Sequence, residues 1–261
     1  MVYLGMVSIE TSVAELSLLA PIPPLRKPLV AELLTSPTGL GEFEELCWHY
    51  LHPFPSAIHL GQIKTYLIKE DAEVGLRVEG PGGGSRLEFD SRLFLEGEQV
   101  GQLMVSLYRR PGSDPDEFYL ELEQAHLWEP ELRGRGLGRA MFENVLALGR
   151  VLGVRAITLF ALYDGRFVWP NLGFQFGDYL PEPSRILCYQ RRFRAYCLRH
   201  GVEPPDLRGW DAPQFARFVS EKRVSARIGN RYERYPCQVD LGRAFMLTRR
   251  PFFLCFPLLQ L

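Results

Sequence analysis

The stretch Arg133–Ala140, with the sequence RGRGLGRA, follows a predicted strand, Phe118–Leu127, and opens a helix with apolar periodicity. Glycines at a strand-to-helix turn let backbone N–H groups come close to a ligand. The first N–H groups of a helix are unpaired and carry partial positive charge. The stretch therefore predicts a site for a phosphate or pyrophosphate, with arginines available for the remaining negative charge.

The spacing of the glycines separates three kinds of phosphate loop. A dinucleotide fold with G-x-G-x-x-G would need a glycine at position 139, where the chain has Arg139. A P-loop would end in Gly-Lys-Ser/Thr, and that ending is absent from the sequence. The spacing fits R/Q-x-x-G-x-G/A, which resembles the acetyl-CoA pyrophosphate loop of the GNAT N-acetyltransferase superfamily.

The resemblance extends to both sides of the loop. Upstream, Leu127–Leu132 (LWEPEL) is similar to the V-x-P-E-Y lead-in of that family. Downstream come the apolar strand 156–162 and then Trp169–Phe174 (WPNLGF), which resembles the family's Y-E-K-L-G-F. These ordered matches cover residues 86–176, about a third of the chain.

The resemblance implies acetyl-CoA as the acyl donor. Backbone N–H groups of the loop would bind the pyrophosphate, and the backbone of the segment before it would bind the pantetheine arm like an added strand. Asp164 is a loose counterpart of an asparagine that helps to hold the cofactor in the family. The cofactor-binding residues expected on this basis are Leu127, Trp128, Glu129, Arg133, Gly134, Arg135, Gly136, Leu137, Gly138, Arg139 and Asp164.

Acetyl transfer to an amine also needs a base and a proton donor for the leaving thiolate. Strand alternation places Tyr119, Glu121 and Glu123 on one face, and some members of the family have a glutamate about ten residues before the loop. Glu123 is the first candidate base and Glu121 the second; the alternative is a solvated or ion-paired strand face. Tyr163 is the candidate donor, because Trp169 occupies the position of the family's usual tyrosine and an indole N–H is no general acid.

The expected activity is direct transfer of an acetyl group, in a ternary complex, to a primary amine of a small molecule or peptide. The alternative is a non-catalytic GNAT-like module that binds CoA or an acidic partner. Fold analogy does not identify the acceptor.

The predicted architecture is α+β, with a mixed and mostly antiparallel GNAT-like sheet flanked by helices. It divides into an N-terminal helical extension (1–70), an acetyl-CoA-binding core (71–180) and a basic C-terminal extension packed on the core (181–261). Helices are expected at 29–35, 42–52, 137–152, 184–200 and 211–222, and strands at 74–79, 86–95, 98–109, 118–127 and 156–162.

Family members usually have two helices between the first strand and the second, and these helices wall the acceptor site. Here only the turn Gly80–Gly84 separates the predicted strand 74–79 from the next strand. Either the first strand lies earlier, near Ile63–Ile68, or the terminal extensions supply the wall.

The composition indicates the general class of protein. The chain has 261 residues, 46% of them hydrophobic and 23% charged, values ordinary for a soluble globular protein. Five cysteines without a C-x-x-C pair, and a start with no basic segment, favour reduced thiols in the cytoplasm. Cys47, His49 and His52 lack zinc-finger spacing, so we expect no metal.

The net charge of −1 is unevenly distributed, because residues 185–250 hold 15 Lys and Arg against 6 Asp and Glu. Arginines alternate with aromatic residues in the predicted helix 184–200, a pattern that can bind nucleic acid. The aromatics recur at steps of three and four, so a packing stripe with a solvated arginine face is the preferred interpretation, and nucleic acid is not the expected partner.

Overall fold

The computed structural model describes residues 4–7, 39–52, 58–68, 86–109, 117–132, 135–177, 183–229, 234–248 and 252–258. These residues form an α+β fold with a mixed, mostly antiparallel sheet and a separate hairpin, as the sequence predicts. The chain divides into two compact units, residues 1–157 with 258–261 (unit 1) and residues 158–257 (unit 2).

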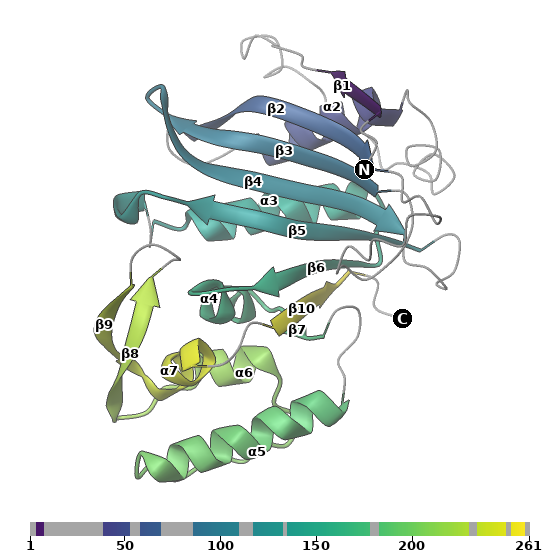
Figure 1. The fold of residues 1–261 in the computed structure, drawn as a ribbon. Helices are drawn as coiled ribbons and strands as arrows, with labels where there is room; N and C mark the ends of the chain where they lie inside the picture. The colour runs from purple at the N-terminus through teal and green to yellow at the C-terminus, as the bar shows by residue number, and fades with distance from the viewer. Residues whose placement is uncertain are drawn as a thin grey trace. The chain divides into compact units, whose positions relative to one another are not determined.

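Unit 1 contains an antiparallel meander. Its strands are β1 (Leu4–Val7), β2 (Ile58–Ile68), β3 (Arg86–Leu95), β4 (Glu98–Arg109) and β5 (Phe118–Leu127), and each pairs with the next (Figure 1). The turn between β3 and β4 is Glu96-Gly97, both with positive φ, which is the conformation that a tight hairpin requires. The expected hairpin is confirmed. Strand β2 includes Ile63–Ile68, the earlier of the two positions expected for the first strand.

Two helices, α2 (Gly39–Leu51) and α3 (Leu137–Val151), cover one face of this sheet (Figure 1). Their apolar stripes meet the alternate apolar residues of β3, β4 and β5 because a strand directs every second side chain to the same face. The fully buried residues of this core include Phe43, Leu51, Leu87, Phe89, Leu103, Val105, Leu120, Val145 and Leu148.

The connection from β5 to α3 is a short 3-10 helix, Pro130–Leu132, followed by the glycine loop. Gly136 is the N-cap of α3 with a φ of 81°, in the left-handed region that favours glycine. Gly153 follows α3 with a φ of 62°, and its N–H donates to the carbonyl of Arg150. Both ends of the helix therefore agree with the sequence.

Unit 2 begins within β6 (Ala156–Ala161), continues through α4 (Gly165–Asn171) and reaches the two-residue strand β7 (Gln175–Phe176). The last strand of the chain, β10 (Phe252–Pro257), lies between β6 and β7 and pairs antiparallel with β7. This apolar strand therefore packs into the sheet, with Leu254 and Cys255 buried.

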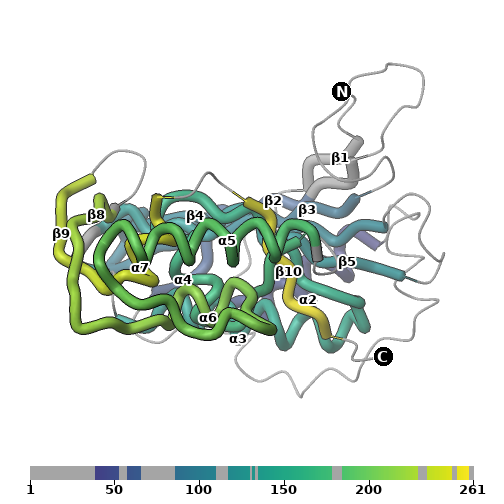
Figure 2. The backbone as a smooth tube through the Cα atoms, turned by 90° about the horizontal axis from the view of Figure 1, so that it is seen from below, coloured from purple at the N-terminus to yellow at the C-terminus, as the bar shows by residue number. Residues whose placement is uncertain are grey.

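The rest of unit 2 consists of α5 (Pro183–Arg199), α6 (Ala212–Arg217), the antiparallel hairpin β8 (Arg223–Gly229) and β9 (Arg234–Asp240), and α7 (Leu241–Thr248) (Figures 1 and 2). Helix α7 contacts α5 and both hairpin strands. An aromatic cluster forms the core, with Phe176, Phe193, Phe215 and Phe245 fully buried.

One predicted boundary differs by several residues, and two predicted elements cannot be compared. The predicted helix 211–222 begins as expected, with Asp211 in a capping box, but ends at Arg217 because Phe218 is extended, with a ψ of 118°. The predicted helix 29–35 and strand 74–79 lie outside the described residues. No helix in the described part of the chain is long and apolar enough to cross a membrane.

Candidate functional site

The sheet of unit 1 has a polar face opposite α2 and α3. Strand register places Glu88 of β3, Ser106 of β4 and Glu121 of β5 in one row across three strands. Arg86 lies two residues before Glu88 on the same face of β3, opposite Tyr108. Residues far apart in the sequence thus meet because β3 and β5 flank β4.

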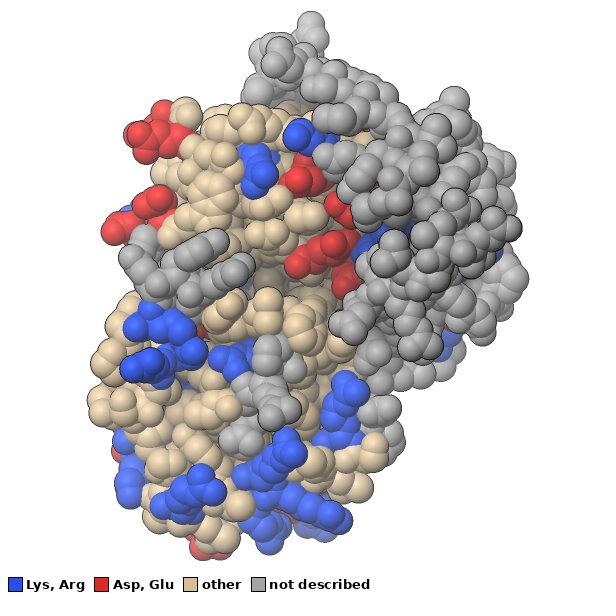
Figure 3. Space-filling view, in the orientation of Figure 1, with Lys and Arg blue, Asp and Glu red and all other residues tan. Residues whose placement is uncertain are grey.

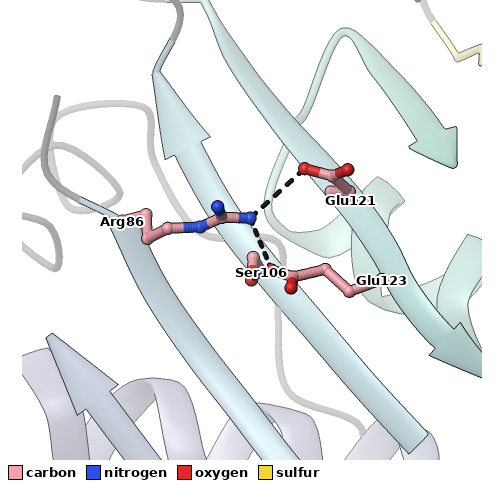
Figure 4. Close-up of polar contacts among 4 residues, drawn as sticks. All are labelled: Arg86, Ser106, Glu121 and Glu123. Atoms are coloured by element: carbon pink, nitrogen blue, oxygen red, sulfur yellow. Dashed lines mark hydrogen bonds and ion pairs between the residues drawn. The ribbon is translucent and has the colours of Figure 1, made fainter. Parts of the chain in front are cut away.

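Arg86 pairs with both glutamates that the sequence singled out. Its Nη2 lies 3.2 Å from Oε2 of Glu121 and also donates to Oε1 of Glu123 (Figure 4). The hydroxyl of Ser106 donates to the same oxygen of Glu123. The prediction that Glu121 and Glu123 share a face is confirmed, and they are ion-paired. We call Arg86, Glu88, Ser106, Glu121 and Glu123 the carboxylate cluster.

A β-bulge brings the second glutamate into this cluster. Val105 pairs with Leu122 and its neighbour Met104 with Gln124, so Glu123 has no partner on β4. An extra residue bends a strand and re-aims the side chain at the bulge. Leu122 still points into the core, where it is 3% exposed. Glu121 and Glu123, on either side of Leu122 at this bulge, both reach one guanidinium.

The cluster is partly buried, with Glu123 exposed, and this burial shifts the protonation of its other glutamates. Ser106 is fully buried and Tyr108 is 5% exposed, while the side chains of Arg86 and Glu121 are 21% and 16% exposed. Desolvation raises the pKa of Glu121, against the opposing effect of Arg86. Desolvation, followed by repulsion from Glu123, raises the pKa of Glu88 to about 7. Glu88 can therefore change its protonation near neutral pH.

The start of α3 has the features of an anion site. No described side chain caps the helix, and its first backbone hydrogen bond runs from the N–H of Ala140 to the carbonyl of Gly136. The N–H groups of residues 137–139 precede that bond. A Cβ at Gly136 would meet no atom within 4 Å, so the glycine borders open space. Arg135 and Arg139 are exposed on either side.

The segment before the loop is partly engaged with β4. The N–H of Trp128 donates to the carbonyl of Val100 at 2.8 Å, and the carbonyl of Glu129 accepts from the N–H of Leu132. Because neighbouring residues of a strand direct their polar groups to opposite edges, the N–H group of Leu127, the last residue of β5, points away from β4.

The remaining candidates lie elsewhere. Arg133 and Gly134 are outside the described residues. Tyr163 and Asp164 belong to unit 2, where they follow β6 and begin α4; Tyr163 has a φ of 46°, and its carbonyl accepts from the side chain of Arg166. Trp169 packs edge-on against Phe174, with ring centroids 5.9 Å apart, a packing role for the residue in the tyrosine position.

Two of the three carboxylates, Glu121 and Glu123, are predicted from the sequence, whereas Glu88, Arg86 and Ser106 are found only in the structure. The period-two pattern of β3 was the available signal, because it places Arg86 and Glu88 on the polar face of a hairpin whose next strand is β5. The pairing of Arg86 with Glu121 and Glu123 depends on register across β4, which no local pattern specifies.

A metal is not indicated by the described residues, among which no group of three or more His, Cys, Asp or Glu could hold an ion. Cys47 is fully buried, and His52 stacks on Trp48 with ring centroids 4.6 Å apart. This part of α2 is a packing face.

Comparison of the chain with protein-family models and with curated proteins gives no match. Its function must therefore be inferred from its own residues.

Proposed function

We propose that this protein is an acetyl-CoA-dependent N-acetyltransferase that moves an acetyl group directly to a primary amine. One observation carries the proposal: β5 and α3, joined by the nine residues 128–136, combine a partly buried carboxylate cluster with an uncapped helix start at a left-handed glycine. Acetyl transfer needs a proton acceptor and a site for the pyrophosphate of the donor. The GNAT resemblance implies that the two follow each other in this order along the chain.

The residues at the start of α3 suit the pyrophosphate of the donor. N–H groups of residues 137–139 and the guanidiniums of Arg135 and Arg139 supply hydrogen bonds and positive charge. The N–H group of Leu127 would orient the pantetheine arm. When bound, acetyl-CoA supplies the activated acyl carbon of its thioester.

The carboxylate cluster supplies the proton acceptor. An amine attacks as the neutral base, so its ammonium form must lose a proton before or during transfer. Glu123 and Glu121 remain candidates, but Arg86 holds both in ion pairs. Glu88 has the pKa best placed for this task, about 7, because a base works best when its pKa is near the working pH. The negative charge of the cluster also attracts a cationic acceptor.

Two measurements test the proposal. Calorimetry with acetyl-CoA should give saturable binding, and a thiol-release assay across a panel of amines should give turnover with at least one of them. Absence of binding at millimolar acetyl-CoA would sink the proposal. Binding without thiol release would favour the non-catalytic alternative, to which the packed Trp169 in the tyrosine position lends weight.

A further inference from the structure

The β8–β9 hairpin of unit 2 has one packed face and one solvent face. Val224, Ala226 and Ile228 of β8 are buried, and α7 contacts both strands. The alternate residues, Arg223, Ser225 and Arg227, are exposed. Because successive side chains of a strand point to opposite faces, these three form a row on the solvent face.

The second strand extends this row with more polar groups. Gln238 lies opposite Ser225, and Arg234 lies opposite Gly229, both exposed. Asp240, opposite Arg223, is the acidic residue of this face among the positions that the structure describes. Three guanidiniums, a hydroxyl and a carboxamide therefore share one face, the types of group that bind phosphate oxygens and base edges. We call this face the hairpin's polar face.

Helix α5 adds positive charge next to the hairpin. Its arginines 191, 192, 194 and 199 are exposed, and none of them forms an ion pair with any residue that the structure describes. Lys222, just before β8, has its Nζ 3.7 Å from the position of a Cβ at Gly201, just after α5. The C-terminal end of α5 therefore adjoins the first residues of the hairpin.

Unit 2 as a whole is basic. It holds 16 Lys and Arg against 9 Asp and Glu, a formal charge of +7 in a chain of net charge −1. Figure 3 shows Lys and Arg side chains gathered over the region of α5, α7 and the hairpin, with few Asp or Glu between them. A net positive charge of this density attracts an anionic partner or counterions.

We propose that the hairpin's polar face, together with the adjoining end of α5, binds double-stranded DNA. A two-stranded ribbon fits the major groove, which is about 12 Å wide. With seven residues in each strand, the hairpin spans about 23 Å at about 3.3 Å per residue. The length and charge of the ribbon favour duplex DNA over an acidic protein or an anionic membrane, and the test below distinguishes the three.

The test compares two double variants that lose the same charge. R223Q/R227Q removes two arginines from the polar face, and R109Q/R150Q removes two exposed arginines from unit 1. Anisotropy with a labelled 20-base-pair DNA, titrated with salt, should show a loss of tenfold or more in affinity for R223Q/R227Q. Its log–log salt slope should be shallower by about 2, since each phosphate contact contributes about 0.9. R109Q/R150Q should bind as the unmodified protein does.

Other ligands test whether this face binds something other than double-stranded DNA. Equal losses in the two variants, or no binding to DNA in 50 mM salt, would overturn the proposal. So would tighter binding to poly-glutamate, to phosphatidylserine vesicles or to a single-stranded oligonucleotide of the same length. Circular dichroism and acetyl-CoA calorimetry on both variants check the fold and the donor site, so that failure here is distinguishable from failure of the proposed function.

Discussion

At the residue scale, Glu88 is the most informative side chain. It lies two residues from Arg86 on β3 and opposite Ser106 on β4, and the ion pairs of Arg86 go to Glu121 and Glu123. Desolvation by burial is the largest influence on the pKa of Glu88; repulsion from Glu123 adds to it, and attraction from Arg86 opposes it. Together these raise its pKa to about 7.

We expect Glu88→Gln to lower kcat/KM for the amine at pH 7 by about 100-fold, the lower end of what a general base contributes. The pH–rate profile should lose its rise near pH 7, whereas a structural role would lower the rate at all pH values alike. Asp90→Asn is the matched control, because Asp90 lies on the same face and accepts from Gln102 at 2.7 Å. An unchanged profile in Glu88→Gln would remove Glu88 from the mechanism.

The same substitution should change how stability depends on pH. The folded-state pKa of Glu88, about 7, exceeds its ordinary value of 4.5, so the folded state binds the proton more tightly than the unfolded state does. Stability from this group is then complete below pH 4.5 and falls as the pH rises to 7. Glu88→Gln should therefore be more stable than the unmodified protein at pH 8. The difference in free energy of unfolding between the two proteins should be about 1–3 kcal/mol larger at pH 8 than at pH 4.5.

Urea unfolding at the two pH values measures this difference. Glu98→Gln, at an exposed position at the start of β4, should show no such pH dependence. A stability difference equal at pH 4.5 and pH 8 would contradict the raised pKa of Glu88.

At the element scale, the start of α3 carries the donor site. Gly136 has a φ of 81°, a conformation in which asparagine and aspartate are the best tolerated L-residues. Gly136→Asp and Gly136→Asn therefore impose similar backbone strain and differ by one negative charge. We expect the Asp variant to lose at least 100-fold in acetyl-CoA affinity by calorimetry, and the Asn variant about tenfold or less, because a carboxylate repels the pyrophosphate. Equal losses would mean that α3 does not bind the phosphates.

At the scale of the whole molecule, two compact units have separate cores. Gly242 in α7 belongs to unit 2, and a Cβ there would lie 2.3 Å from the carbonyl oxygen of Phe215 and 2.7 Å from that of Phe218. Backbone atoms cannot yield cheaply, so Gly242→Ala should destabilise unit 2 by about 2 kcal/mol or more.

Hydrogen exchange locates this effect. Amide protection should fall across residues 158–257 more than in the sheet of unit 1. Gly41→Ala is the control, since a Cβ at Gly41 in α2 meets nothing within 4 Å and alanine favours a helix. Uniform loss of protection over both units would show that they unfold as one.

Local chemistry allowed the sequence by itself to determine most elements. The hairpin Arg86–Arg109, strand β5, helix α3 and its glycine start follow from periodicity, turn residues and capping, which act within a few residues. The α+β class followed from the order of those elements. The end of α6 was predicted wrongly because Phe218 leaves the helix where the chain packs into the aromatic core of unit 2.

Tertiary structure alone decided the composition of the site. Arg86 meets Glu121 and Glu123 across 35 and 37 residues of sequence, through the register of β4 and a bulge at Glu123. Burial raises the pKa of Glu88, and this shift depends on the surroundings of the side chain and not on its chemical type. Pairing and desolvation depend on which strands become neighbours, and that is settled only when the sheet closes over its core.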